Sequence, residues 1–132
     1  MAYKVFISSS SRDSDLARDL AKRLEKAGLY VIMPSKSIEA GADVVARIRD
    51  EMRKASEVIV IMTNNSVHSP WLLFEMGYAT SLGLHLTPLV QGVEPKELPE
   101  IIKQMEYVKY SDLDRYIARL QERGRESSQS AA

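Results

Sequence analysis

The chain has 132 residues, 45% of them hydrophobic and 27% charged, which suits one globular domain rather than a disordered or two-domain chain. The 18 basic and 18 acidic side chains cancel, so no global field attracts nucleic acid or anionic lipid, and no apolar run reaches the roughly 20 residues that span a bilayer. The sequence has no cysteine, which excludes disulfides and thiolate chemistry and leaves the reducing cytoplasm as the expected location.

The first third of the chain predicts a strand, a helix and a second strand. Residues 3–8 are β-branched and aromatic and run into four serines, which is typical of a buried strand that feeds a loop. Leu and Ala then recur at helical spacing over 13–27, and Gly28 lies where a C-terminal cap belongs. Residues 29–33 form a second apolar run, which Pro34 ends.

The middle of the chain predicts a buried strand between two helices. Apolar residues return at helical spacing over 44–55. Residues 58–62 show no polar alternation, which predicts a central parallel strand that is covered on both faces. The next helix starts well, with Ser69 as the N-cap and Pro70 in the first turn, and we expect it to end near Leu82.

The last third of the chain is less regular. We expect a strand over 84–90, a short helix around 98–103, a strand over 105–110 and a closing helix over 112–121. After residue 123 the composition turns to Gly, Ser, Gln and Ala, with nothing to bury. The segment 124–132 is therefore predicted to be a disordered tail or a linker.

Five strands that alternate with helices predict one α/β domain over residues 1–123. Right-handed crossovers give a five-stranded parallel sheet with helices on both faces, a flavodoxin-like three-layer sandwich. We choose the strand order 2-1-3-4-5, which places the crevice for a ligand beyond the carboxyl ends of strands one and three. The segments 8–12 and 63–71 should line this crevice.

The helix after the third predicted strand carries one acidic side chain and no basic one. This acid is Glu75, and Trp71 lies one turn before it on the same helix face. An aromatic ring beside a carboxylate suits a flat, cationic ring and its attached sugar. Two plainer interpretations remain open here: Glu75 marks the wet stripe of a mostly buried helix, and Trp71 is a core or lid aromatic.

Polar side chains follow the first predicted strand: Ser8, Ser9, Ser10 and Arg12. Hydroxyls, backbone N–H groups and a guanidinium at the start of a helix can hold phosphate or ribose. The alternative is helix capping by Ser11 or Asp13. The chain has neither of the glycine-rich phosphate motifs, and its two histidines lack partners at metal-ligand spacing, so we predict no metal and no cofactor.

Four motifs follow one another along the chain: Val5-Phe6-Ile7-Ser8, Ile38-Glu39-Ala40-Gly41, Val58 to Met62, and Ser69-Pro70-Trp71 with Glu75. Their order and spacing resemble the TIR (Toll/interleukin-1 receptor) domain family, above all its bacterial members. Many TIR domains cleave the nicotinamide–ribose bond of NAD. The resemblance implies that Glu75 is the catalytic glutamate, that Trp71 is the aromatic residue one turn earlier, and that NAD is a substrate rather than a cofactor.

The loop over 34–41 corresponds by this resemblance to a segment that gates the substrate pocket and joins TIR domains to one another. The resemblance implies that Pro34 borders the substrate and that four residues contact a second TIR domain: Lys36, Ser37, Ile38 and Glu39. The chain departs from the family pattern at the end of the second strand, where it has Met33-Pro34 in place of an aromatic residue and an acid.

Three functions are compatible with these residues. The first is an NAD glycohydrolase or cyclase that acts as the effector of a bacterial defence or signalling system, with a fused or separate sensor domain. The second is a non-catalytic module that works through assembly with other TIR domains. A third is an enzyme similar to nucleoside deoxyribosyltransferases, which also set a glutamate against a glycosidic bond. Linear and cyclic ADP-ribose both remain open as the product.

Overall fold

The computed structural model describes residues 3–33 and 50–130, with side chains described as far as residue 126. The predicted loop over 34–41, and with it Pro34 and the four expected contact residues, lies outside the described residues. The same holds for most of the helix predicted over 44–55, of which the described part is helical over 50–53.

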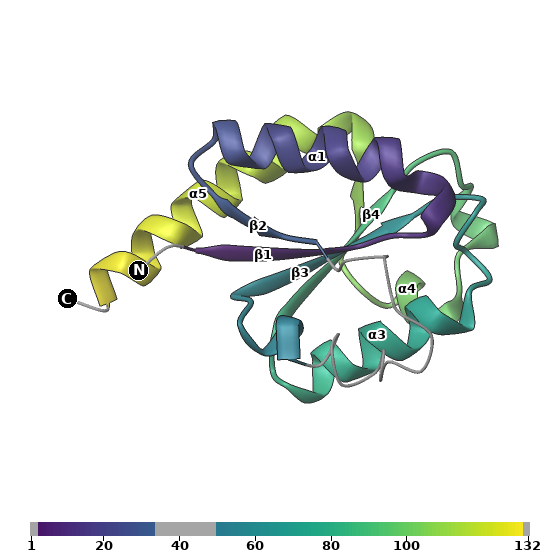
Figure 1. The fold of residues 1–132 in the computed structure, drawn as a ribbon. Coiled ribbons are helices and arrows are strands. Elements are labelled where there is room, and N and C mark those ends of the chain that lie inside the picture. Colours follow the sequence, from purple (N-terminus) through teal and green to yellow (C-terminus); the bar gives the residue numbers. More distant parts are fainter. Residues whose placement is uncertain (1–2, 34–49, 131–132) are drawn as a thin grey trace.

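The strands form one parallel sheet in the order β2-β1-β3-β4-β5, which confirms the predicted flavodoxin-like fold (Figure 1). The strands are β1 (Lys4–Ser8), β2 (Tyr30–Ile32), β3 (Glu57–Met62), β4 (His85–Val90) and β5 (Val108–Lys109). All six residues of β3 are buried, as expected for a strand with neighbours on both sides and helices over both faces.

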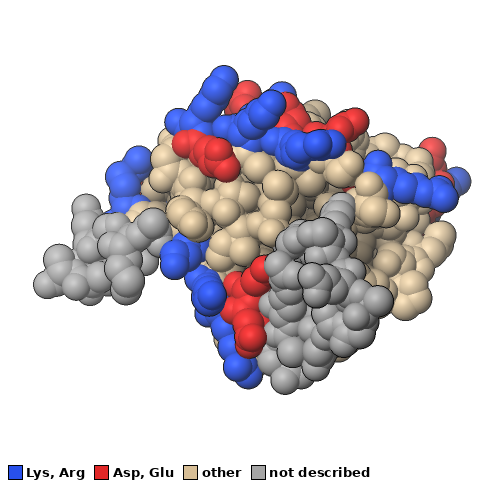
Figure 2. Space-filling view, in the orientation of Figure 1, with Lys and Arg blue, Asp and Glu red and all other residues tan. Residues whose placement is uncertain are grey.

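Helices cover both faces of the sheet (Figure 1). The helices α1 (Ser14–Lys26) and α5 (Leu113–Ser130) lie on one face, and α3 (Pro70–Ser81) and α4 (Glu100–Lys103) lie on the other. Two hydrophobic cores result: the first core lies between the sheet and helices α1 and α5, and the second core lies between the sheet and helices α3 and α4. Because side chains alternate along a strand, β3 sends Ile59 and Ile61 into the first core and Val58, Val60 and Met62 into the second core. On the face shown in Figure 2, basic and acidic side chains are mixed over α1.

The helix ends match the predicted stop signals on α1 and α3. Gly28 and Gly83 follow these helices with φ of 88° and 74°, a conformation that glycine adopts without steric cost. The predicted N-cap of α3 is also confirmed, since Ser69 accepts a hydrogen bond from the N–H of Leu72 at 3.3 Å.

The end of the chain differs from the prediction. The last helix continues to Ser130 instead of ending near 121, so residues 124–130 are helical and the predicted disordered tail is wrong for them. Composition missed a tertiary contact: a Cβ on Gly124 would lie 3.3 Å from the Cβ of Tyr3, so glycine lets the helix pass close to the start of β1.

The edge of the sheet also differs from the prediction. The strand β5 has two residues rather than the six expected over 105–110, and it pairs with β4 only from Leu89 onward. This explains why β4 tolerates Pro88. The N–H of Gln91 donates to the carbonyl of Met62 in β3. Backbone N–H groups alternate in direction along a strand, so the nitrogen of Pro88, three residues earlier, faces away from β3, toward the edge where β5 does not pair.

No helix among the described residues has the length and apolar character needed to cross a membrane.

Candidate functional site

The site forms where β1 and β3 end and α3 begins. Ser8 is the last residue of β1, pairs with Val60 of β3, and is fully buried. The loop after β3 leads to the N-cap of α3, and Glu75 lies in the second turn of that helix. This is the carboxyl end of the sheet, beside the point where the strand order reverses.

Glu75 is a buried acid rather than part of a wet stripe. Its residue is 2% exposed, so the plainer interpretation from sequence is wrong. Burial raises the pKa of Glu75 to about 7, and the hydroxyl of Ser8 partly offsets this rise. Neither Ser8 Oγ nor Glu75 Oε2 meets the distance and angle of a hydrogen bond within the described residues. Both polar groups can therefore form further hydrogen bonds to a ligand.

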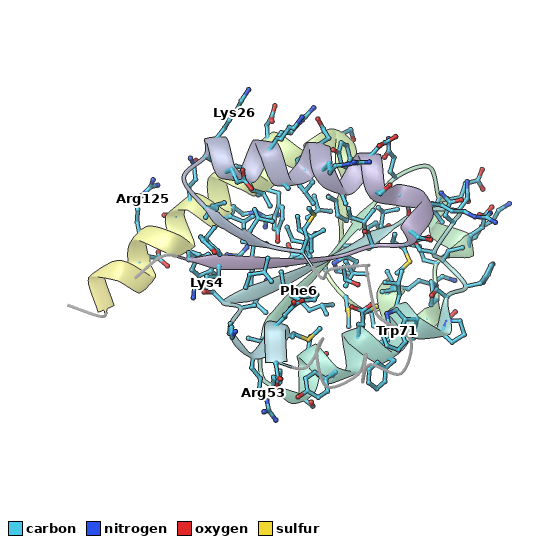
Figure 3. The ribbon with its side chains drawn as sticks, viewed as in Figure 1. Lys4, Phe6, Lys26, Arg53, Trp71 and Arg125 are labelled. Carbon is cyan, nitrogen blue, oxygen red and sulfur yellow. The ribbon has the colours of Figure 1, made fainter. Side chains whose placement is uncertain are left out.

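Trp71 lies outside the core. It is 40% exposed and stacks on Phe74 with ring centroids 5.5 Å apart, and Phe74 in turn stacks on Tyr78 at 6.5 Å. Trp71 lies at the opposite end of the domain from Arg125 (Figure 3). The interpretation of Trp71 as a core aromatic is therefore wrong, and the ring is accessible from solvent.

The polar residues after β1 have different surroundings. Ser8 faces Glu75, whereas Ser9 and Ser10 are half-buried and Arg12 is exposed. The hydroxyl of Ser10 accepts a hydrogen bond from the N–H of Arg12 at 3.2 Å, which caps a short 3-10 turn. The structure thus joins Ser8 to Glu75, and it uses Ser10 rather than Ser11 or Asp13 as the cap.

A polar network that sequence reasoning missed connects the loops after β1 and β3 through buried Asp13 and Thr63 and exposed Asn65. Asp13 is 6% exposed and caps nothing; its carboxylate accepts hydrogen bonds from Thr63 Oγ1 at 2.7 Å and Asn65 Nδ2 at 2.8 Å. The two sides of this network are about fifty residues apart in sequence, so no local pattern could have paired them.

A cavity lies beside this region, at the carboxyl ends of β4 and β5. Its volume is about 620 Å³, and its lining includes Gly92, Tyr107 and Lys109 but neither Ser8 nor Glu75. Asn64 Nδ2 donates to the carbonyl of Gly92 at 3.2 Å, which joins the loop after β3 to the wall of the cavity. Within the described part of the chain, no cluster of side chains could hold a metal ion.

Comparison with known proteins identifies the family. The model of the TIR domain family matches residues 5–123, so the chain belongs to the TIR domain family, as the sequence motifs predicted. The TIR domain of the Toll-related receptor TRR-2 from Hydra magnipapillata has the same fold, with a TM-score of 0.74 at 19% identity over 92% of this chain and 99% of that one.

Two curated relatives carry provisional names as cyclic ADP-D-ribose synthases. TIR2 of Cytobacillus dafuensis is 27% identical over 61% of this chain and 23% of its own length. BdTIR of Brachypodium distachyon, named for the 2' cyclic product, is 26% identical over 91% of this chain and 55% of its own length. The chain thus spans about a quarter and about half of these relatives.

Proposed function

We propose that this TIR domain cleaves NAD at the bond between nicotinamide and ribose, with Glu75 as the catalytic residue. The observation that carries the proposal is the buried carboxyl of Glu75, which faces the Ser8 hydroxyl and whose Oε2 has no hydrogen-bond partner among the described residues. A carboxyl group held in this way costs stability, and strongly perturbed acids at the end of a sheet are typical of functional sites. The names of the two curated relatives support the same chemistry.

The residues suit this reaction because the leaving group needs no proton. When the bond between C1′ and the ring nitrogen breaks, both electrons stay with nicotinamide, which leaves as a neutral molecule. The ribosyl centre then carries positive charge, which the Glu75 carboxylate stabilises at low local dielectric. Water that attacks C1′ loses a proton and gives linear ADP-ribose, whereas a nitrogen of the adenine ring, which carries no hydrogen, attacks C1′ through its lone pair and gives cyclic ADP-ribose.

Other side chains of the site would bind and orient the substrate. Trp71 offers an exposed ring on which a nicotinamide or adenine ring stacks, and the hydroxyls of Ser8, Ser9 and Ser10 offer hydrogen bonds to ribose or phosphate, with Arg12 nearby in sequence. We place this activity in the effector part of a defence or signalling protein in which a sensor domain controls the TIR domain.

A second candidate function is assembly without catalysis, and one observation favours it. The helix α3 exposes a row of large apolar side chains, with Trp71 at 40%, Leu73 at 41% and Phe74 at 43%. Clustered exposed apolar residues of this kind mark interaction surfaces. In this function the domain would recruit further TIR domains, and NAD would not be consumed.

The deciding experiment measures nicotinamide release by the purified protein at high concentration. We expect the wild type to consume NAD and Glu75→Gln to lose at least about 100-fold in kcat, the cost of removing a key charge-stabilising group. Chromatography of the products separates linear from cyclic ADP-ribose, and a panel of nucleosides tests the deoxyribosyltransferase alternative.

Glu106→Gln is the matched control, because its side chain is 87% exposed and the substitution is the same. Circular dichroism establishes that both variants fold. Wild-type turnover in Glu75→Gln would remove the catalytic assignment, and a folded wild type that leaves NAD intact at high protein concentration would favour the assembly function.

A further inference from the structure

We infer that Asp13 is a positioning residue that fixes the two loops on either side of the site. The inference rests on the proposed NAD cleavage for its kinetic part, whereas its structural part can be tested without any activity. Asp13 lies between the loop that follows Ser8 and the start of α1, and its partners Thr63 and Asn65 lie in the loop that leads to Trp71 and Glu75.

The geometry of the contact requires a carboxylate with two acceptors. Asp13 Oδ2 accepts from the hydroxyl of Thr63 at 2.7 Å, and Oδ1 accepts from the amide of Asn65 at 2.8 Å. Thr63 Oγ1 also accepts from the backbone N–H of Asn65 at 3.0 Å. The hydroxyl of Thr63, the backbone N–H of Asn65 and one N–H of the Asn65 amide therefore all donate within this small network, and hydrogen bonds to a carboxylate are the stronger kind.

Val67 of the loop after β3 packs into the core beneath α3, and the other side-chain hydrogen bonds of this loop among the described residues go to its own strand and to the loop after β4. Ser66 Oγ accepts from the N–H of Thr63 at 2.9 Å and donates to the carbonyl of Ile61 at 3.1 Å. Asn64 Nδ2 donates to the carbonyl of Gly92 at 3.2 Å. Asp13 connects this loop to the loop that follows the neighbouring strand β1, at the carboxyl ends of the two strands.

The inference follows from what each loop carries. One loop continues from Ser8, which faces Glu75, and the other ends at the N-cap of the helix that bears Glu75 and Trp71. A substrate that contacts both loops needs them at a fixed separation, and small displacements of positioning groups cost large factors in rate. Glu75 itself is held by the packing of α3, so loosening the loops should affect substrate binding more than the chemical step.

A reciprocal substitution tests this assignment. Asn65→Asp alone places two carboxylates against each other, which should separate the loops. Combined with Asp13→Asn, it restores the pair with donor and acceptor exchanged: the amide introduced at position 13 donates to the carboxylate introduced at position 65, and its oxygen still accepts from Thr63. The double variant keeps the net charge of the wild type.

We expect Asn65→Asp to lower kcat/KM by about tenfold or more, mainly through a higher KM, and the double variant to recover most of this loss. The fluorescence of Trp71, the one tryptophan of the chain, gives a readout without activity: acrylamide quenching should increase in Asn65→Asp and return toward the wild-type value in the double variant. Asp15→Asn is the control, since the Asp15 side chain is 98% exposed.

The outcomes separate this inference from the proposed function. If the wild type does not cleave NAD, the quenching series still decides whether Asp13 holds the loops. A double variant that stays as impaired as Asn65→Asp in both readouts overturns the inference. So does an Asn65→Asp variant that melts at a lower temperature yet keeps wild-type KM and quenching well below its melting point, because Asp13 would then be structural only.

Discussion

Two of the described glutamates are buried, and the difference between them distinguishes a structural acid from a candidate catalytic one. Glu57 is fully buried, accepts from the hydroxyls of Tyr3 at 2.6 Å and Tyr116 at 2.8 Å, and lies 3.5 Å from a nitrogen of Arg123. Glu75 is nearly as buried but has no cationic partner among the described residues, and its Oε2 has no hydrogen bond there. An unsatisfied buried acid needs an explanation that a satisfied one does not, and under the proposed function a bound substrate would supply it.

The pKa of Glu75 predicts how stability depends on pH. Because the folded-state pKa is about 7 against 4.5 for the unperturbed group, the unfolded chain loses its proton first as pH rises. The carboxyl therefore destabilises the fold progressively between pH 4.5 and 7, by about 3 kcal/mol in full. Glu75→Gln removes this dependence.

We expect Glu75→Gln to melt above the wild type by several degrees at pH 8, with a much smaller difference at pH 5. Thermal melts of both proteins across this range provide the measurement, with Glu106→Gln as the exposed control. A difference between wild type and Glu75→Gln that stays constant from pH 5 to pH 8 would show that the carboxyl is not desolvated in the fold.

At the scale of elements, α3 connects the core to the site. Leu72 and Met76 point into the second core, and Trp71 and Phe74 are exposed. The helix is apolar on both sides, so its sequence pattern alone did not show which residues face the sheet. Glu75 lies on the buried side, where the Ser8 hydroxyl faces its carboxyl.

Trp71→Ala and Leu72→Ala test this division within one turn. Leu72 is 2% exposed, so its truncation should cost about 2–5 kcal/mol of unfolding free energy. Trp71→Ala should cost only about 1–2 kcal/mol but reduce kcat/KM about tenfold or more, since stacking on an aromatic ring contributes about 1–3 kcal/mol. Urea denaturation and NAD cleavage provide the two readouts. A Trp71→Ala protein that is unfolded would contradict the assignment of Trp71 as a platform.

Most helices and strands could be predicted from the sequence, because the residues that start, end or fill them are close together in the chain. Serine and proline mark the start of α3, glycine marks the ends of α1 and α3, and an unbroken apolar run marks β3. What could not be predicted depends on contacts between distant segments. The helix α5 continues past Arg123, where Gly124 lies against Tyr3 and Arg123 lies beside Glu57. The acceptors of Asp13 find their donors about fifty residues away. Glu75 and Trp71 were predicted from one helix, but the burial of Glu75 depends on the whole sheet.

At the scale of the molecule, Glu57 joins the two ends of the chain. Tyr3 comes just before β1, Glu57 begins β3, and Tyr116 and Arg123 belong to α5. This cluster of Glu57, Tyr3, Tyr116 and Arg123 lies at the amino ends of the strands, away from the site. Desolvation and the neighbouring Glu57 carboxylate hold the pKa of both tyrosines above its usual range. The cluster thus closes the fold without taking part in the proposed chemistry.

Tyr116→Phe should therefore destabilise the domain by about 1.5–3 kcal/mol, because it removes a hydrogen bond to a buried carboxylate. Tyr3→Phe should cost less, since Tyr3 is half-buried and water can replace its hydroxyl. Tyr110→Phe is the matched control, as its hydroxyl donates to Asp19 at an exposed position. Urea denaturation provides the ranking, and equal losses for all three variants would contradict a special role for Glu57.

The partners of Glu57 also determine when the fold can be completed during synthesis. A ribosome releases β1 first, yet the carboxylate at the start of β3 does not receive all its donors until Arg123 has emerged from the exit tunnel. Before that point the nascent chain contains a sheet that α1 covers without the help of α5, and a buried acid that is only partly compensated. Completion of the domain is therefore a late step in the synthesis of the domain itself, during which chaperones have access to the part of the sheet that α5 later covers.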